Sequence, residues 1–258
     1  MPGALFDTHT HYDDDAYDGD REELLAGLSS RGVGYVVNVG YDLSSSEAGR
    51  RLAEDFSFIW YAAGVHPHNA AEAPDGFEAL LLGLLKGSKA VALGEIGLDY
   101  YYDHSPRECQ REVFARQLAL AGEAGMPVVI HDRDAHGDII DILNAYKGRL
   151  HGGVMHCFSG GRGLAEQALD LGLYIAFGGA LTFKNAHDLV NAAAFTPHDR
   201  LLLETDCPYL SPVPFRGRRN DSSRLGIIAE RMAQIRGVST DEIAQLTTDN
   251  AKRLFSIT

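Results

Sequence analysis

Eight short runs of β-branched and apolar residues recur along the chain, and most of the segments between them are polar with helical periodicity. The runs occupy residues 4–11, 34–40, 58–66, 90–98, 126–131, 153–158, 173–179 and 201–206. Near-continuous apolar strands that alternate with helices indicate a parallel sheet covered by helices. Eight such units in 258 residues predict an α/β fold of the (β/α)8 TIM-barrel type. A doubly wound open sheet is the alternative, although no glycine-rich phosphate-binding fingerprint follows any run.

Helix boundary signals support this division of the chain. Ser105 is placed to cap a helix, Pro106 suits its first position and Glu108 can complete a capping box. The helix is expected to end near Gly125, since glycine suits the residue after a helix. Segment 239–257 opens with a second capping box and is expected to be the closing helix.

Composition restricts the classes of protein to consider. No linker or low-complexity tract divides the chain, so residues 1–258 are expected to form one TIM-barrel domain. No apolar run approaches the length of a membrane span, and the first residues lack a secretory signal. We therefore expect a soluble, cytoplasmic protein without membrane association. No obligate protein partner is evident.

Cysteine content and charge narrow the chemistry. Cys109, Cys157 and Cys207 are odd in number and far apart, which argues against a disulfide framework or a cysteine-only zinc site. The net charge of −13 argues against broad binding of nucleic acid but leaves room for a local basic patch. Bound cations could offset part of the excess acid.

Residues of the types that bind metals stand at the ends of several predicted strands. His9 and His11 are two apart in the first strand, so both side chains share one face, as does that of Asp7. By themselves they could be two hydrogen-bonded histidines, and Asp7 could orient one of them or accept backbone hydrogen bonds. Four further residues end strands of their own: Glu95, His131, His156 and Asp206.

The carboxyl ends of barrel strands converge on one mouth, where active sites of this fold are built. Four imidazoles and two carboxylates exceed the needs of one tetrahedral zinc ion, but they suit two divalent ions that share a bridging carboxylate. The sequence therefore predicts a binuclear site. Mixed nitrogen and oxygen ligands leave zinc, manganese, magnesium and cobalt open.

With these motifs in view, the chain resembles the TatD family of metal-dependent deoxyribonucleases, which belong to the amidohydrolase-like barrels. The matching stretches include "FDTHTHYDD", "GVHPHNA", "GEIGLDYYYDHSPRECQREVFARQLALA", "PVVIHDRDA", "HCFSG", "TFKNA", "ETDCPYLSPVPFRGRRND" and "TTDNAKRLF". The resemblance implies that His9, His11 and Asp206 hold one metal. It also implies that Glu95 bridges to a second metal held by His131 and His156.

Two positions depart from the family pattern. Phe215 stands where a histidine is common, and Asp132 where a serine is frequent. Both follow predicted strands and are expected near the mouth, away from the six ligands. Because of these two departures, the family resemblance predicts the substrate less closely than it predicts the metal ligands.

The predicted chemistry is phosphodiester hydrolysis, with Asp206 and Glu95 as catalytic residues. Two adjacent divalent ions can lower the pKa of a shared water and clamp phosphate oxygens. We expect Asp206 to orient that water and to accept its proton. His66, after the third strand, could contact a substrate phosphate or simply bond to backbone.

A basic segment and an aromatic run are further candidates for substrate binding. Arg216, Arg218 and Arg219 in "PFRGRRND" could form a basic rim for nucleic acid, or a solvated charged loop. The tyrosines at positions 100–102 could stack bases or pack against the barrel.

Three functions remain open from the sequence. The first is an exonuclease that acts on DNA, possibly also on RNA, with two divalent ions. The second is a hydrolase of the same fold that cleaves an ester or amide such as a D-aminoacyl-tRNA ester. The third is a catalytically silent scaffold, although the complete ligand set argues against it.

Overall fold

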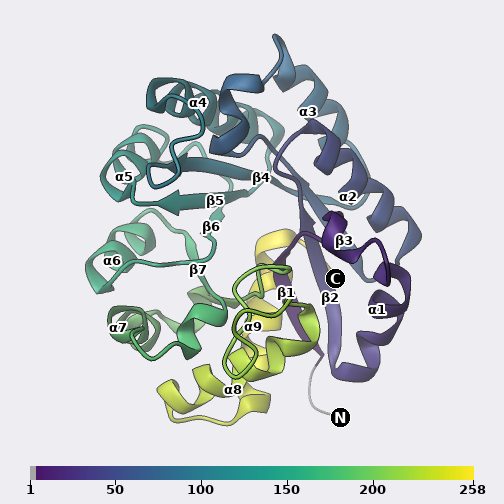
Figure 1. Cartoon of the computed structure of the whole chain (residues 1–258). Helices are drawn as coiled ribbons and strands as arrows, with labels where there is room; N and C mark the ends of the chain where they lie inside the picture. Colours follow the sequence, from purple (N-terminus) through teal and green to yellow (C-terminus); the bar gives the residue numbers. More distant parts are fainter. Residues whose placement is uncertain (1–3) are drawn as a thin grey trace.

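The computed structural model describes residues 4–258, and within them a parallel eight-stranded sheet is surrounded by helices (Figure 1). The strands are arranged in chain order, each beside the next. β1 and β8 approach each other where the amide of His11 donates to the Cys207 carbonyl at 2.8 Å. This near-closed barrel confirms the predicted (β/α)8 fold. The strands are β1 (Leu5–Thr10), β2 (Val33–Val39), β3 (Ile59–Ala63), β4 (Ala90–Asp99), β5 (Val128–Arg133), β6 (Gly153–Met155), β7 (Tyr174–Phe177) and β8 (Leu201–Leu203).

The connections between strands carry the helices, which cover the outside of the sheet in Figure 1. In residues 4–258, no helix is long and apolar enough to cross a bilayer. The α-helices of this part are α1 (Arg21–Gly27), α2 (Leu43–Asp55), α3 (Phe77–Leu85), α4 (Arg107–Ala124), α5 (His136–Ala145), α6 (Arg162–Asp170), α7 (His187–Phe195), α8 (Leu225–Arg236) and α9 (Thr240–Phe255). Short 3-10 helices are η1 (Asp15–Tyr17), η2 (Ser29–Arg31), η3 (Pro67–Glu72), η4 (Gly179–Thr182), η5 (His198–Arg200) and η6 (Ser222–Arg224).

Two strands continue further than the apolar pattern predicts. β4 runs on to Asp99 and β5 to Arg133, and these two residues are paired in register. Glu95 therefore lies within β4, and the expectation that it closes the strand is wrong. Continued pairing between the two strands keeps both extended, although glycine and charged residues enter their sequences.

The start of α4 differs from the prediction, while its end agrees. Pro106 is the residue before the helix, and its side chain can accept no hydrogen bond from the first turn. The hydroxyl of Ser105 donates instead to the His68 carbonyl at 2.8 Å and accepts from the amide of Ala71 at 3.0 Å. The predicted capping box is therefore wrong, because the serine joins α4 to η3. Gly125 ends the helix in a left-handed conformation with φ of 68°, as predicted.

Helix α9 closes the barrel at the starts of the strands. Ser239 caps it by accepting a hydrogen bond from the Glu242 amide at 3.2 Å, as the sequence predicts, but the Glu242 side chain does not complete the predicted capping box. Thr248 donates to the Ala4 carbonyl at 2.9 Å, and Asn250 donates to the Leu201 carbonyl at 2.9 Å. Apolar side chains of α9 and of the strands form one buried cluster, separate from the larger cluster under the outer helices. α9 therefore does not cover the opposite end of the barrel, where the carboxyl ends of the strands lie.

Candidate metal centre

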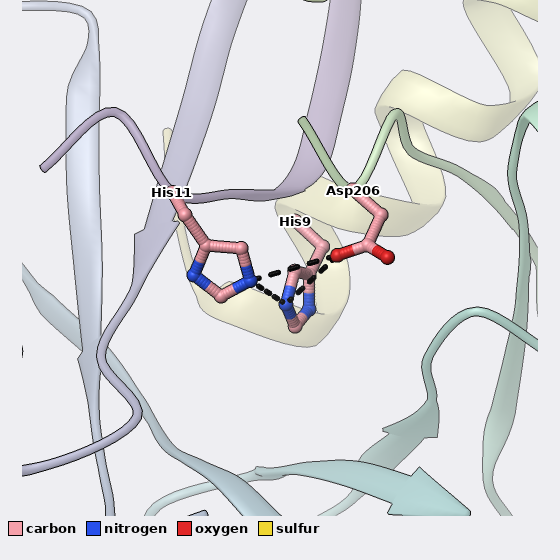
Figure 2. A group of neighbouring side chains, drawn as sticks. All are labelled: His9, His11 and Asp206. Atoms are coloured by element: carbon pink, nitrogen blue, oxygen red, sulfur yellow. Dashed lines mark hydrogen bonds and ion pairs between the residues drawn. The ribbon is translucent and has the colours of Figure 1, made fainter. Parts of the chain in front are cut away.

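The first strand and the segment after β8 bring three of the predicted ligands together (Figure 2). The Nε2 atoms of His9 and His11 lie 3.2 Å apart. Oδ1 of Asp206 lies 3.8 Å from Nε2 of His9 and 3.5 Å from Nε2 of His11. The amide of Asp206 donates to the His9 carbonyl at 3.0 Å, and its φ of 56° is one that non-glycine residues seldom adopt. The backbone thus fixes the carboxylate beside the histidine pair.

Glu95 lies between this group and a second one. Its Oε2 is 3.4 Å from Nε2 of His9 and 3.8 Å from Nε2 of His11. Its Oε1 is 2.8 Å from both Nδ1 of His131 and Nε2 of His156. Each oxygen of one carboxylate therefore faces a different pair of imidazoles. The structure brings all six sequence-predicted ligands to one place.

The spacing of these atoms fits metal binding. A zinc ion about 2.0–2.1 Å from each ligand atom, with tetrahedral geometry, sets the ligand atoms roughly 3.3–3.4 Å apart. The His9–His11 nitrogens are 3.2 Å apart and the His131–His156 nitrogens 3.3 Å apart. Among residues 4–258, the clusters whose ligand atoms all lie within 4.8 Å of one another include His9–His11–Asp206 and His9–Glu95–His156. These buried clusters are consistent with a binuclear metal site.

The outward-facing ring nitrogens of His11 and His131 show which nitrogen of each of these two rings would face a metal. Nδ1 of His11 lies 2.9 Å from the Val39 carbonyl, and only an N–H can bond there. Nε2 of His131 lies 3.2 Å from Oδ2 of Asp99. In both rings the outer partner holds a proton on the outer nitrogen, so the inner nitrogen is the one that would give its lone pair to a metal, after losing any proton of its own.

Two buried carboxylates that lie behind the proposed histidine ligands were not among the site residues predicted from the sequence. Asp99 ends β4, and Glu204 stands two residues before Asp206, with Oε1 3.5 Å from Nδ1 of His156. Glu204 also accepts a hydrogen bond from the Cys157 amide. Both could have been noticed in the sequence as carboxylates near the end of a strand. Each, however, lies close in sequence to a stronger ligand candidate, Glu95 for Asp99 and Asp206 for Glu204.

Electrostatics keep the central carboxylates charged. Burial alone would raise the pKa of Glu95, but the positive field of His156 and hydrogen bonds with His131 and His156 hold it well below its usual range. Burial likewise opposes ionisation of Asp206, but the hydrogen bond with His11 and the positive field of His156 together lower its pKa. Burial lowers the pKa of His9. Burial opposes protonation of His11, but the hydrogen bond with Asp206 and the negative charge of Glu95 raise its pKa to about 9. A divalent ion needs anionic oxygens and neutral imidazole nitrogens, so it would displace a proton from such a ring when it binds.

His66 lies against the second group. Its Nε2 is 3.5 Å from Oε1 of Glu95, and its Nδ1 accepts a hydrogen bond from the His68 amide at 3.1 Å. Burial lowers the pKa of His66 well below its usual value, so the ring is neutral. Because Nδ1 is an acceptor, the proton of the neutral ring is on Nε2. His66 therefore presents an N–H to the site.

The three arginines of the basic segment have different surroundings. Arg219 pairs with both carboxylate oxygens of Asp20, at 2.7 and 2.6 Å, and lies over the Tyr17 ring. The guanidinium of Arg216 lies 4.4 Å from the Phe183 ring centre. Within residues 4–258, the Arg218 side chain forms no ion pair or hydrogen bond. The segment is thus held by Arg219, while Arg218 stays available.

The two departures from the family pattern have local partners. Phe215 lies under the guanidinium of Arg224, with 4.6 Å to the ring centre. Asp132 lies 2.8 Å from Nδ1 of His136, and it accepts a hydrogen bond from the Ala135 amide at the start of α5. In residues 4–258, both are outside the metal-type clusters.

Comparison with known proteins agrees with this geometry. The family model described as TatD related DNase matches residues 6–256. The uncharacterized metal-dependent hydrolase YabD of Bacillus subtilis is 42% identical over 253 residues, which cover 98% of this chain and 99% of that protein. The 3'-5' ssDNA/RNA exonuclease TatD of Klebsiella pneumoniae is 34% identical over 258 residues, with 98% of each chain covered.

Solved structures give the same result. YjjV, a TatD homologue from Escherichia coli, aligns over 100% of both chains with a TM-score of 0.94 and 31% identity. A TatD family hydrolase from Entamoeba histolytica aligns over 100% of both chains with a TM-score of 0.88 and 25% identity. The chain therefore belongs to the TatD family of metal-dependent hydrolases.

Proposed function

We propose that this hydrolase is a nuclease that removes nucleotides from an end of single-stranded DNA or RNA. The observation that carries the proposal is Glu95, whose two oxygens face two separate imidazole pairs. A shared carboxylate of this kind suits two-metal hydrolysis of phosphate esters. The exonuclease name of the Klebsiella pneumoniae relative supports the choice of substrate.

The proposed ligands form two sets that share one residue. His9, His11 and Asp206 would hold the first ion, His131 and His156 would hold the second, and Glu95 would serve both. Zinc, manganese and magnesium all remain candidates, because the donors mix nitrogen and oxygen. When bound, the two ions would supply Lewis acid chemistry that activates a water and neutralises phosphate oxygens.

The chain's own residues then position the substrate and move the proton. Asp206 is ionised, and Figure 2 shows one of its oxygens toward the histidine pair and the other turned away. The second oxygen is free to accept a proton from the attacking water. The Nε2–H of His66 would donate to a phosphate oxygen, as would the guanidinium of Arg218 from the basic rim.

Hydrolysis of end-labelled oligonucleotides tests the proposal. Metal-stripped protein is supplied separately with zinc, manganese or magnesium and given single-stranded DNA and RNA labelled at either end. We expect stepwise shortening from one end that depends on metal and is lost in Asp206→Asn. Asp199→Asn is the matched control, since this exposed aspartate lies before the start of β8, away from the site.

Absence of cleavage with every metal would contradict the proposal. Aminoacyl-tRNA and small esters would then be the next substrates, because the same donor set serves acyl transfer. Cleavage that survives in Asp206→Asn would leave the substrate class intact but remove Asp206 from the reaction.

A further inference from the structure

Two tyrosines with exposed rings lie near the candidate metal centre: the Tyr102 ring centre is 5.5 Å from that of His68, which is 6.4 Å from that of His131. Tyr101 and Tyr102 follow β4 and leave 58% and 55% of their surfaces exposed. Their ring centres are 4.8 Å apart in an edge-to-face arrangement. The Tyr102 ring also stacks on that of His104, at 5.6 Å with 11° between the planes. Large exposed rings that pack on one another make a surface suited to a flat, apolar ligand.

Asp99 fixes these tyrosines relative to the candidate metal centre. Its Oδ1 accepts hydrogen bonds from the amides of Tyr101 at 3.0 Å and Tyr102 at 2.8 Å. Its Oδ2 lies 3.2 Å from Nε2 of His131 and 2.8 Å from Nε2 of His68. One buried carboxylate therefore holds both a proposed metal ligand and the backbone of the exposed rings.

Arg133 adds a cation to the same surface. It stands two positions after His131 on β5, so both side chains share a face of the strand. Its guanidinium lies 4.7 Å from the Tyr101 ring centre. In the described part of the chain, Arg133 forms no ion pair and no side-chain hydrogen bond. It is free to meet an anion beside the rings.

The neighbouring Tyr100 shows what an aromatic residue with a packing role looks like here. Its ring is covered by the guanidinium of Arg107, at 4.3 Å, and its hydroxyl donates to Asp138 at 2.5 Å. Arg107 is itself paired with Asp103 at 2.6 Å. Tyr101 has a covering cation without an acidic partner, and its ring is open to solvent. The two environments separate a packed tyrosine from exposed ones.

We propose that Tyr101, Tyr102 and Arg133 form a stacking subsite for an unpaired nucleobase next to the scissile phosphate. This inference rests on the proposed nuclease function and names how the substrate is held. A base stacks on the exposed rings while Arg133 pairs with an adjoining phosphate. Every base has a flat face, so the subsite accepts any sequence but needs the base out of a duplex.

Substrates that lack one base test the subsite. Oligonucleotides carry a single abasic residue at successive positions from the end that is cleaved. For the wild type, we expect kcat/KM to fall roughly tenfold when the abasic residue occupies the subsite. This is the change expected from losing the stacking of one base. The variant Tyr101→Ala/Tyr102→Ala should show a similar fall in kcat/KM on the intact substrate. Its kcat/KM should not fall further when the base is missing. Tyr101→Phe/Tyr102→Phe keeps both rings and should retain wild-type values.

A matched pair of arginine variants tests the cation. Arg149 lies 4.8 Å from the Tyr146 ring centre, in the segment between α5 and β6 that leads into the opposite end of the barrel. Arg133→Gln should raise KM for the oligonucleotide several-fold, and Arg149→Gln should leave it unchanged. Equal effects of the two substitutions would overturn the role of Arg133.

A binding measurement separates this inference from the proposed activity. The metal-loaded protein is titrated with fluorescent oligothymidylate whose terminal linkages are hydrolysis-resistant phosphorothioates, with and without the abasic residue. Tighter binding of the intact strand that disappears in Tyr101→Ala/Tyr102→Ala supports the subsite even if no cleavage is seen. Equal binding of both strands by the wild type overturns the subsite, even if cleavage is robust.

Discussion

The direction of each imidazole in the candidate metal centre is set by atoms behind it. His11 donates backward to a backbone carbonyl, and His131 to Asp99. A carboxylate behind a histidine fixes the tautomer and strengthens the opposite nitrogen as a donor. Affinity for metal should therefore depend on residues that never contact the ion.

Asp99→Asn should weaken metal binding about 10- to 100-fold, because the amide is a poorer acceptor for the N–H of His131. Titration of the stripped protein against a competing chelator measures the change. Asp138→Asn is the control, since Asp138 bonds only to Tyr100 and Arg111 in the described residues. Equal affinities for wild type and Asp99→Asn would show that the tautomer is set elsewhere.

His66→Ala should lower kcat/KM for an oligonucleotide about 10- to 100-fold, the loss expected for one hydrogen bond to a charged group. The metal content should stay at the wild-type value, since its Nε2 carries a proton. Elemental analysis of the purified variant checks this. Loss of one metal would instead make His66 a ligand.

At this scale the sequence predicts the candidate site well where residue type and strand position coincide. His9, His11, His131 and His156 are conspicuous because imidazoles seldom recur at strand ends. Asp99 and Glu204 escape prediction because their role depends on which nitrogen faces outward, which only the folded geometry shows. The different fates of Arg218 and Arg219 depend likewise on the distant Asp20.

Among the secondary-structure elements, β1 and the segment after β8 form the least local part of the site. Asp7 joins them: Oδ1 accepts from the Thr205 amide at 2.9 Å, and Oδ2 accepts from the hydroxyls of Thr205 and Ser222 at 2.6 Å each. Of the two roles left open from sequence, Asp7 thus anchors the segment that carries Asp206.

Asp7→Ala should lower the free energy of unfolding by about 2–4 kcal/mol, because three buried donors lose their acceptor. Chemical denaturation of metal-free protein measures this without a contribution from bound ions. Asp199→Ala, at an exposed position, should change stability little. Similar values for both variants would show that water replaces the carboxylate.

Element boundaries were harder to predict than the elements themselves. All eight strands lie where the apolar runs stand, but Glu95 falls inside β4, because β5 pairs with residues beyond it. Ser105 is not a cap, because η3 offers its hydroxyl better partners. Both errors arise where a contact distant in sequence outweighs a local preference.

In the whole molecule, the site and the closing helix occupy opposite ends of one barrel. α9 bonds to the starts of β1 and β8, whereas the metal-type clusters lie around their carboxyl ends. Stability contributed by α9 should therefore be separable from catalysis.

Asn250→Ala should lower the unfolding free energy by about 1–3 kcal/mol, because the carbonyl of His198 and the buried carbonyl of Leu201 lose a donor. Its kcat should remain that of the wild type below the melting temperature. Thermal unfolding and oligonucleotide turnover measure the two effects. Gln245→Ala on the exposed side of α9 is the control, and a parallel loss of kcat would contradict the separation.

The position of α9 also has a consequence in time. Until this helix is made, the apolar side chains of the strands lack the cover that Ala251, Leu254 and Phe255 of α9 give to their cluster. A nascent chain therefore displays hydrophobic surface until α9 has been made.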